Sequence, residues 1–358
     1  MPRPLGEQVV VITGASSGIG RCTALYLAAR GARVVLTARS AEALDDVARE
    51  IRDAGGVALV VPGDVRGEED MAAVADAAAD RFGRIDTWVN NAGVYFYGAV
   101  VDFTLDDFRA ALETDLIGVI NGTRQALRHM LPAHSGVIVQ ISSILALRGA
   151  PYTAPYSAAK AGIDGFCDAL RAELRGSGVH VATLYVPNVD TPIYQHARSR
   201  LARKPAAVPP VHDPIVVARK IARLAVAPRP RAYIGAFRVA YGGLGRLFPR
   251  ATDWFLHHAA GIMEGPDPAG PDNVEAPVES LEAAGRTGVG EGGGRGAEGA
   301  GRPPATGAFG GAAIRGGWGG KGIRGFTLGT VARALPWETV LAAGLAGFWA
   351  GRKWGRRG

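Results

Sequence analysis

The sequence predicts an α/β fold, in which a doubly wound parallel sheet is covered by helices on both faces. Short runs that are almost wholly apolar alternate with amphipathic runs of helical length, as is typical of parallel strands buried between helices. A glycine-rich turn joins the first apolar run to the helix that follows it. Glycine or polar residues follow the later apolar runs, so we expect them to gather at one edge of the sheet.

The periodicity of the apolar residues places each element in chain order. We expect strands at residues 8–13, 33–37, 57–61, 87–89, 137–141 and 179–186, because these runs are short and nearly continuously apolar. We expect helices at residues 21–30, 41–54, 67–82, 104–130 and 154–175, where apolar residues recur three and four apart. A later amphipathic stretch, residues 233–256, is a candidate cover for a substrate cleft.

Composition divides the 358 residues into three parts. Residues 1–258 are expected to form one α/β domain. Residues 259–330 are rich in glycine, alanine and proline, and they carry too few large apolar side chains to offset the entropy of ordering. We expect them to be a disordered linker. Residues 331–358 are expected to form a short apolar helix with a basic end, and they leave two alternatives open: peripheral membrane contact, or docking on the protein's own body or on a partner.

The bulk chemistry narrows the class of protein. Cys22 and Cys167 both lie in apolar helical runs, and residues 1–7 lack the apolar core of a secretory signal, so we expect no disulfide and a cytoplasmic location. The net charge is +7, but the basic residues are scattered among acidic ones without an aromatic-interleaved stripe. Nucleic acid is therefore not an expected partner, and we assign no metal site.

The turn after the first strand is a candidate cofactor site. Gly14 permits a tight turn, Gly18 lets the backbone approach a phosphate, and Gly20 lets helix and strand pack closely. The start of the following helix offers N–H groups to an anion. Such a turn can be purely structural, but its place between strand and helix favours a dinucleotide.

The tip of the second strand indicates which dinucleotide is bound. An acidic residue near this point would hold a ribose 2′-hydroxyl. Thr37, Ala38 and Arg39 stand there instead, and a guanidinium suits a 2′-phosphate. The alternative is a solvated surface arginine. We predict NADP(H) rather than NAD.

A tyrosine and a lysine four residues apart carry the candidate chemistry. Tyr156 and Lys160 would share one face of the helix at 154–175. A free phenol has a pKa of about 10, and an ammonium beside it favours the phenolate. The pair can then exchange a proton with a carbinol oxygen. Such pairs also arise by chance, so the other motifs in the chain decide whether this pair has a catalytic role.

The combined motifs resemble the short-chain dehydrogenase/reductase family in its single-domain, Rossmann-like branch. The matching pieces are Thr13-Gly14-x-x-x-Gly18-x-Gly20, Asp64-Val65, Asn90-Asn91-Ala92-Gly93, Ser143, Tyr156-x-x-x-Lys160 and Pro187-x-x-x-Thr191. They come in the family's order and cover residues 5–258.

The resemblance implies a role for each matched residue. Ser143 would hydrogen-bond the substrate oxygen, Tyr156 would act as general acid/base, and Lys160 would lower the Tyr156 pKa and bind the nicotinamide ribose. The other matched residues would line the cofactor: Gly14, Ser16, Ser17, Gly18, Ile19, Gly20, Arg39, Asp64, Val65, Asn90, Asn91, Ala92, Gly93, Pro187, Val189 and Thr191. For Ser142 we expect a hydroxyl that faces backbone. Family members usually associate through the helices at 104–130 and 154–175, which implies a homo-oligomer.

Two positions depart from the family pattern. Asp115 stands where the family usually has an asparagine that holds a water linked to the lysine, and its charge would favour the ammonium and alter that relay. Asn188 follows Pro187 where glycine is common, and asparagine tolerates the left-handed backbone that such a turn would need.

The substrate side is expected at residues 95–97, 145–153 and 188–212. The first two segments are aromatic or apolar, which favours a hydrophobic carbonyl or alcohol. The third contains the candidate pocket residues Tyr194 and His196, and also a basic cluster of Arg198, Arg200, Arg203 and Lys204. We favour a solvated face for this cluster, with an anionic substrate tail or acidic lipid as the alternative.

These observations predict an NADP(H)-dependent oxidoreductase that interconverts a secondary alcohol and a ketone or aldehyde. The alternative is an NADPH-binding scaffold or sensor with impaired catalysis, which Asp115 and the long tail motivate.

Overall fold

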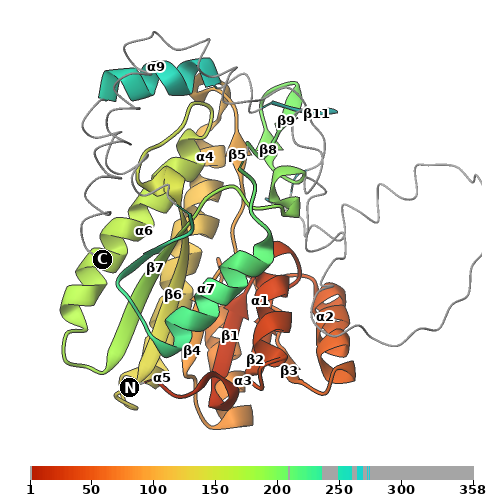
Figure 1. The fold of residues 1–358 in the computed structure, drawn as a ribbon, viewed down its shortest axis with the longest axis vertical. Coiled ribbons are helices and arrows are strands. Elements are labelled where there is room, and N and C mark those ends of the chain that lie inside the picture. Colours follow the sequence, from red (N-terminus) through yellow and green to blue (C-terminus); the bar gives the residue numbers. More distant parts are fainter. Residues whose placement is uncertain are drawn as a thin grey trace, which may run out of the picture.

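The predicted α/β architecture is confirmed. The computed structural model describes residues 2–208, 210–235, 249–259, 264–268, 272 and 274. Within these residues, seven strands form one parallel sheet with helices on both faces (Figure 1). Both cysteines are buried thiols, in agreement with the prediction.

The strand order places β1 beside β4, the central strand of the sheet. In chain order the strands are β1 Val9–Thr13, β2 Arg33–Thr37, β3 Val57–Val60, β4 Thr87–Asn90, β6 Gly136–Ser143, β7 Val179–Val186 and β10 Arg231–Tyr233. Their order across the sheet is β10-β7-β6-β4-β1-β2-β3. The chain thus builds outward from β1 first to one side and then, from β4, to the other. Ligands in such sheets bind where the order reverses, beyond the carboxyl ends of the strands.

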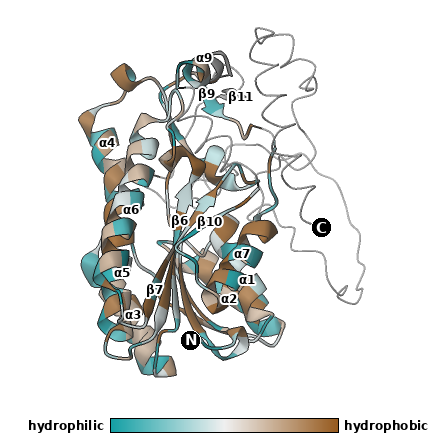
Figure 2. Cartoon of the chain, turned by 60° about the vertical axis from the view of Figure 1, so that its left-hand side comes forward, coloured by the Kyte–Doolittle hydropathy of each residue, from teal (hydrophilic) through white to brown (hydrophobic). Residues whose placement is uncertain are grey.

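Alternation along the strands divides the core into two layers. The helices are α1 Gly18–Ala28, α2 Ala41–Asp53, α3 Glu68–Phe82, α4 Leu105–Leu112, α5 Gly118–Met130, α6 Ala154–Glu173, α7 Pro214–Val226 and α9 Pro249–Ala259. Val10 and Ile12 pack with apolar residues of α1, α2 and α7, while Val9 and Val11 pack with those of α3, α5 and α6. Figure 2 shows these two groups of helices on opposite sides of the sheet.

The predicted helix at 104–130 contains an irregular turn. Thr104 begins it with a capping box, in which its hydroxyl accepts from the Asp107 N–H and the Asp107 carboxylate accepts from the Thr104 N–H. Between α4 and α5, residues Glu113–Ile117 form a π-turn, η3. The wider turn was not predicted, because a single turn of five residues is too short to be recognised within a long apolar pattern. It carries Asp115.

Small elements complete the substrate side. The strand β5 Phe96–Tyr97 pairs in parallel with β8 Arg198–Ser199, and β9 Arg203–Pro205 pairs antiparallel with β11 Glu264–Pro268. The short helical turns are η1 Leu5–Glu7, η2 Val100–Asp102, η4 Ile144–Ala146 and η5 Pro192–Tyr194.

The strand β11 falls within the stretch expected to be a disordered linker. Its backbone pairs with β9, which supplies the hydrogen bonds that its composition gave no reason to expect. The remainder of that linker beyond residue 274, and the short helix expected at 331–358, lie outside the described residues. In the part of the chain that the structure describes, none of the helices combines the length and apolar character needed to cross a membrane.

Two glycine-to-alanine substitutions test the close packing at the first turn. A Cβ on Gly20 would lie 2.0 Å from the Gly14 carbonyl oxygen, whereas a Cβ on Gly165 in α6 would meet nothing within 4 Å. We expect Gly20→Ala to lower the free energy of unfolding by about 1–3 kcal/mol, because backbone must move. Gly165→Ala should raise it by about 0.5–1 kcal/mol, as expected for a helix interior. Urea denaturation measures both, and equal effects would contradict the packing described.

Candidate active site

The predicted site residues gather at one edge of the sheet. Gly14 follows β1, Arg39 follows β2, Asn90 ends β4, Ser143 ends β6, and Pro187 follows β7. Since all these strands are parallel, their carboxyl ends face the same way. The edge includes the point between β1 and β4 where the strand order reverses.

Ser143, Tyr156 and Lys160 come together from β6 and α6. The Ser143 hydroxyl accepts the Leu145 N–H at 3.1 Å and lies close enough to the Tyr156 phenol to lower its pKa. The Lys160 ammonium lies 5.5 Å from the centre of the Tyr156 ring and donates to the Ile141 carbonyl at 3.4 Å. All three side chains are buried, with residue exposures of 7%, 9% and 5%. The hydroxyl, phenol and amine predicted from distant motifs therefore share one enclosed space.

The pKa of Tyr156 moves in the opposite direction from the prediction. Burial is the main cause and raises the pKa of the phenol well above its ordinary value; the nearby charge of Asp115 and the neighbouring Tyr194 raise it further. The neighbouring Ser143 hydroxyl lowers the Tyr156 pKa, but its effect is outweighed. The lysine alone does not set the acidity, since the loss of solvent around the phenol dominates.

Asp115 is the fourth member of the site. Its Oδ1 accepts the Val94 N–H at 2.9 Å and lies 3.8 Å from the Lys160 ammonium. Its Oδ2 is buried and makes no hydrogen bond within the described part of the chain. Burial raises the pKa of Asp115 to about 6, against the opposing effects of Lys160 and the Val94 N–H. A Cβ on Gly93 would lie 2.7 Å from Oδ1, so this close approach requires glycine.

The glycine turn has the shape of a dinucleotide cradle. Gly14 and Gly18 have φ angles of +64° and +50°, which favour glycine. A Cβ on Gly14 would lie 2.8 Å from the Ala92 Cα, so the turn packs directly on the Asn-Asn-Ala-Gly segment. Asn91 fixes that packing by donating to the carbonyls of Thr13 and Gly14 at 2.9 and 3.2 Å.

The start of α1 completes the cradle. Its N-cap residue Ser17 makes no side-chain capping bond, which leaves the N–H groups of the first turn to face an anion. Ser16 and Ile19 lie in the same turn and are partly buried. Thr191 closes over it from the far side, 3.3 Å from the Cβ position of Gly18. These features fit the pyrophosphate of a nicotinamide dinucleotide.

The Asn90 side chain has a structural role, although it was expected to line the cofactor. It is 3% exposed, and its amide donates to the Val119 carbonyl, the Thr123 hydroxyl and the Gln140 amide oxygen. This buried network joins the end of β4 to α5 and β6. It uses the N–H groups of the Asn90 side chain.

The surroundings of Ser142 and Asn188 also differ from the family pattern or from the expected contacts. The Ser142 hydroxyl is buried without a hydrogen-bond partner in the described residues, rather than bonded to backbone. Asn188 does not adopt the left-handed backbone, since only His134 and Tyr152 among the described non-glycine residues have positive φ. The Asn188 side chain instead bridges the loop, donating to the Val208 carbonyl at 2.6 Å and accepting from the Tyr194 hydroxyl at 3.0 Å.

Arg39 and Asp64, which are expected at the adenosine end of a cofactor, lie near each other. Burial raises the pKa of Asp64, but hydrogen bonds from Arg66 and the charges of Arg66 and Arg39 outweigh it and lower the net value. Arg39 therefore lies close enough to Asp64 to act on its charge. The Arg39 Nη1 also donates to the Val274 carbonyl at 3.3 Å. Val65 is buried beside this end and touches the Cβ position of Gly118.

A cluster of tyrosines lies on the side where the sequence predicts the substrate. The Tyr95 ring packs edge to face on Tyr156 at 4.8 Å and on Tyr194 at 5.5 Å between ring centres. Tyr97 packs likewise on Tyr152 at 5.8 Å. The predicted aromatic segment thus surrounds the phenol at the centre of the site. α9 approaches the same side, because Arg148 donates to the Pro249 carbonyl at 3.1 Å.

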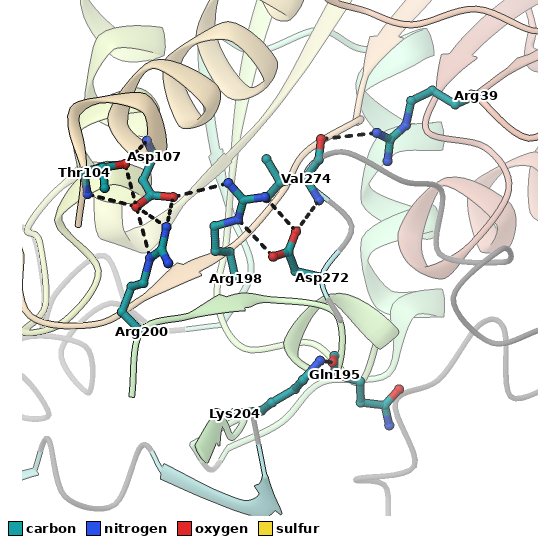
Figure 3. Close-up of polar contacts among 9 residues, drawn as sticks. All are labelled: Arg39, Thr104, Asp107, Gln195, Arg198, Arg200, Lys204, Asp272 and Val274. Carbon is teal, nitrogen blue, oxygen red and sulfur yellow. Dashed lines mark hydrogen bonds and ion pairs between the residues drawn. The ribbon is translucent and has the colours of Figure 1, made fainter. Parts of the chain in front are cut away.

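The basic cluster of the 188–212 loop is only partly solvated, because Arg200 and Arg203 are exposed but Arg198 and Lys204 are not. Arg198 and Arg200 both pair with Asp107, which is 1% exposed, and Arg198 also pairs with Asp272 (Figure 3). Lys204 is buried and donates to the Gln195 carbonyl. The sequence did not identify these acidic partners, because they come from α4 and from the segment after β11, far away in the chain.

The comparisons with known proteins agree with the geometry. Residues 8–202, more than half of the chain, match the family model described as short chain dehydrogenase. The chain therefore belongs to the short-chain dehydrogenase family, whose members are oxidoreductases that act on alcohol and carbonyl groups with a nicotinamide cofactor.

Individual relatives align over most of the described domain. The chain is 40% identical over 247 residues to cis-4-hydroxycyclohexanecarboxylate dehydrogenase of Sinomonas cyclohexanicum, covering 68% of this chain and 98% of that protein. It is 38% identical over 255 residues to the uncharacterized oxidoreductase YxnA of Bacillus subtilis, covering 70% and 72%. It is 40% identical over 178 residues to a 3-oxoacyl-[acyl-carrier-protein] reductase of Synechocystis, covering 49% and 72%.

The raised pKa of Asp115 predicts a loss of stability as pH rises. The folded-state pKa of about 6 exceeds the ordinary value, so the folded protein holds this proton while the unfolded chain releases it. Relative to Asp115→Asn, the wild type should lose on the order of 3 kcal/mol of unfolding free energy between pH 4 and pH 7. Chemical denaturation across this range measures the difference. Asp106→Asn, at a side chain that is 85% exposed, is the control and should show a constant difference. A constant difference for Asp115→Asn would contradict the assigned burial.

Proposed function

We propose that this protein is an NADP(H)-dependent oxidoreductase that interconverts a secondary alcohol and a ketone or aldehyde on a hydrophobic small molecule. The observation that carries the proposal is the burial of Ser143, Tyr156 and Lys160 beside one another at the same sheet edge as the glycine turn. A bound nicotinamide supplies or accepts the hydride.

The residues of the chain hydrogen-bond the substrate oxygen and transfer its proton. In reduction, the Ser143 hydroxyl donates a hydrogen bond to the carbonyl oxygen, and the Tyr156 phenol gives that oxygen its proton. In oxidation, the Tyr156 phenolate takes the proton back. The raised pKa of Tyr156 keeps it protonated at neutral pH, which suits the acid role in reduction. Lys160 holds the ribose and offsets the negative charge that forms on the phenolate oxygen.

Arg39 supports the choice of NADP(H). It stands beyond β2 where an acidic residue would favour NAD, and its charge already acts on the neighbouring Asp64. A guanidinium binds a phosphate through charge-assisted hydrogen bonds that a 2′-hydroxyl cannot match. Asp64 and Val65 would contact the adenine.

The tyrosine cluster supports a hydrophobic substrate, and a cyclic alcohol or ketone suits it best. The rings of Tyr95 and Tyr194 pack around Tyr156 and present apolar surface to whatever reaches the phenol. Two relatives are named for ring substrates, cis-4-hydroxycyclohexanecarboxylate and a 3beta-hydroxysteroid, the latter protein being from Eggerthella lenta. We propose that the enzyme acts on such small molecules as a cytoplasmic homo-oligomer.

A second function has a specific observation in its favour. Asp115 places a carboxylate 3.8 Å from Lys160 and raises the Tyr156 pKa, so it opposes formation of the phenolate. An NADPH-binding scaffold or sensor would tolerate that arrangement. It predicts cofactor binding without turnover on a panel of carbonyl compounds and alcohols, whereas the enzyme turns over at least one of them.

Removal of the phenol tests the assigned chemistry. We expect Tyr156→Phe to lower kcat at least about 100-fold, because general acid–base catalysis contributes that much or more, while NADPH binding persists. The consumption of NADPH with a responsive cyclic ketone gives kcat, and fluorescence titration gives the affinity. Tyr26→Phe on α1 is the matched control and should keep full turnover. Full turnover by Tyr156→Phe would remove the phenol from the mechanism.

A pair of nucleotides that differ only by the 2′-phosphate tests the role of Arg39. Arg39→Gln should weaken 2′,5′-ADP binding about tenfold or more and leave 5′-AMP binding nearly unchanged, because only the phosphate needs the charge. Isothermal titration measures both affinities. Arg66→Gln removes a neighbouring arginine that pairs with Asp64, and it should change the two affinities by the same factor. If Arg39→Gln also affects both equally, the assignment of NADP(H) is wrong.

A further inference from the structure

A continuous series of polar contacts leads from α4 to Arg39 and passes through residues that follow β11. Figure 3 shows its members: Thr104, Asp107, Arg198, Asp272, Val274 and Arg39, with Arg200 and Lys204 beside them. The series joins the substrate side of the site to the adenosine end.

Asp107 is the fixed end of the series. It is 1% exposed and closes the capping box with Thr104. Arg200 donates through Nη2 to both carboxylate oxygens at 2.7 Å. Burial raises the pKa of Asp107, but the hydrogen bonds from Arg200 and Thr104 outweigh it, so the net pKa is lowered and the residue is a carboxylate at neutral pH.

Arg198 connects this buried carboxylate to Asp272. Its Nη1 donates to Asp107 at 3.2 Å, while its Nε and Nη2 donate to the two oxygens of Asp272 at 2.9 and 3.2 Å. The Arg198 side chain is 16% exposed, so the pairing is shielded from much of the solvent. A fork of two parallel bonds fixes direction as well as distance.

Asp272 in turn fixes the backbone of Val274. Its Oδ1 accepts the Val274 N–H at 3.0 Å, which closes a local turn. The Val274 side chain is 1% exposed and packs with Val94, Phe96 and Phe103. The peptide is therefore held on both sides, by an apolar contact and by a charged one. Its carbonyl accepts from Arg39.

We propose that Asp272 is a positioning residue for cofactor specificity. Through Val274, it holds the Arg39 guanidinium at the place where the cofactor's 2′-phosphate binds. This inference rests on the proposed NADP(H) dependence. It also gives Asp272 and Val274 a function, although they lie within the stretch that the sequence predicted to be a linker.

The physical advantage lies in ordering the arginine before the cofactor arrives. An arginine side chain has many rotamers and loses much of that freedom when it binds a phosphate. A carbonyl bond on one of the five guanidinium donors restrains the side chain and keeps its full charge. Part of the conformational entropy of the arginine side chain is then lost when the protein folds, so less is lost when the cofactor binds. The effect should appear only with ligands that carry the 2′-phosphate.

The substitution Asp272→Asn in the full chain tests the proposal. The amide still accepts from the Val274 N–H but loses the charge that holds Arg198. We expect the affinity for 2′,5′-ADP to fall about threefold to tenfold and that for 5′-AMP to stay unchanged, as measured by isothermal titration. Arg198→Gln breaks the same link from its other side and should give the same selective loss. Asp106→Asn, at the exposed neighbour of Asp107, is the control and should change neither affinity.

The double variant Arg39→Gln/Asp272→Asn shows whether the effect passes through Arg39. If it does, the second substitution adds no further loss once Arg39 is gone. The proposal is overturned if the losses of the two single variants add in the double variant. It is also overturned if Asp272→Asn weakens the binding of both nucleotides equally, leaves the ratio of their affinities unchanged, or binds 2′,5′-ADP more tightly. If Arg39→Gln selectively weakens 2′,5′-ADP binding but Asp272→Asn does not, this inference alone is overturned. If neither variant selectively weakens 2′,5′-ADP binding, the NADP(H) assignment is overturned as well.

Discussion

The parallel pairing of the seven strands is the constraint on which the site depends. Because β1, β2, β4, β6 and β7 all run in one direction, the residues at their carboxyl ends share an edge although they are far apart in the chain. The glycine turn, Arg39 and Ser143 reach that edge from three different strands. α6 then brings Tyr156 and Lys160 to it from the side. A single architectural rule thus assembles both the cofactor cradle and the reactive groups.

Burial sets the chemistry of the assembled groups. Ser143, Tyr156, Lys160 and Asp115 are all enclosed, so each charge is felt more strongly than it would be in water. The carboxylate of Asp115 stabilises the ammonium of Lys160 but opposes a phenolate at Tyr156. The balance favours a protonated phenol, which is the form required to deliver a proton to a carbonyl oxygen.

The features that the sequence predicted correctly have local signals. The turn at Gly14 and the Tyr156–Lys160 pair are short motifs whose spacing already fixes their geometry within a strand–turn–helix unit. The features that it missed depend on contacts between distant segments. The acids that pair with Arg198 could not be chosen from the many in the chain, and the burial that raises the Tyr156 pKa depends on the packing of Tyr95 and Tyr194. The π-turn under Asp115 leaves almost no trace in the apolar periodicity.

A crystal structure of the full chain with NADPH tests the central claim most directly. The account predicts the pyrophosphate on the glycine turn at the start of α1, the 2′-phosphate at Arg39, and the nicotinamide ring beside the Tyr156 hydroxyl with its ribose within hydrogen-bonding reach of the Lys160 amine. A cofactor bound with its nicotinamide away from Ser143 and Tyr156, or bound elsewhere than on the turn, would contradict it.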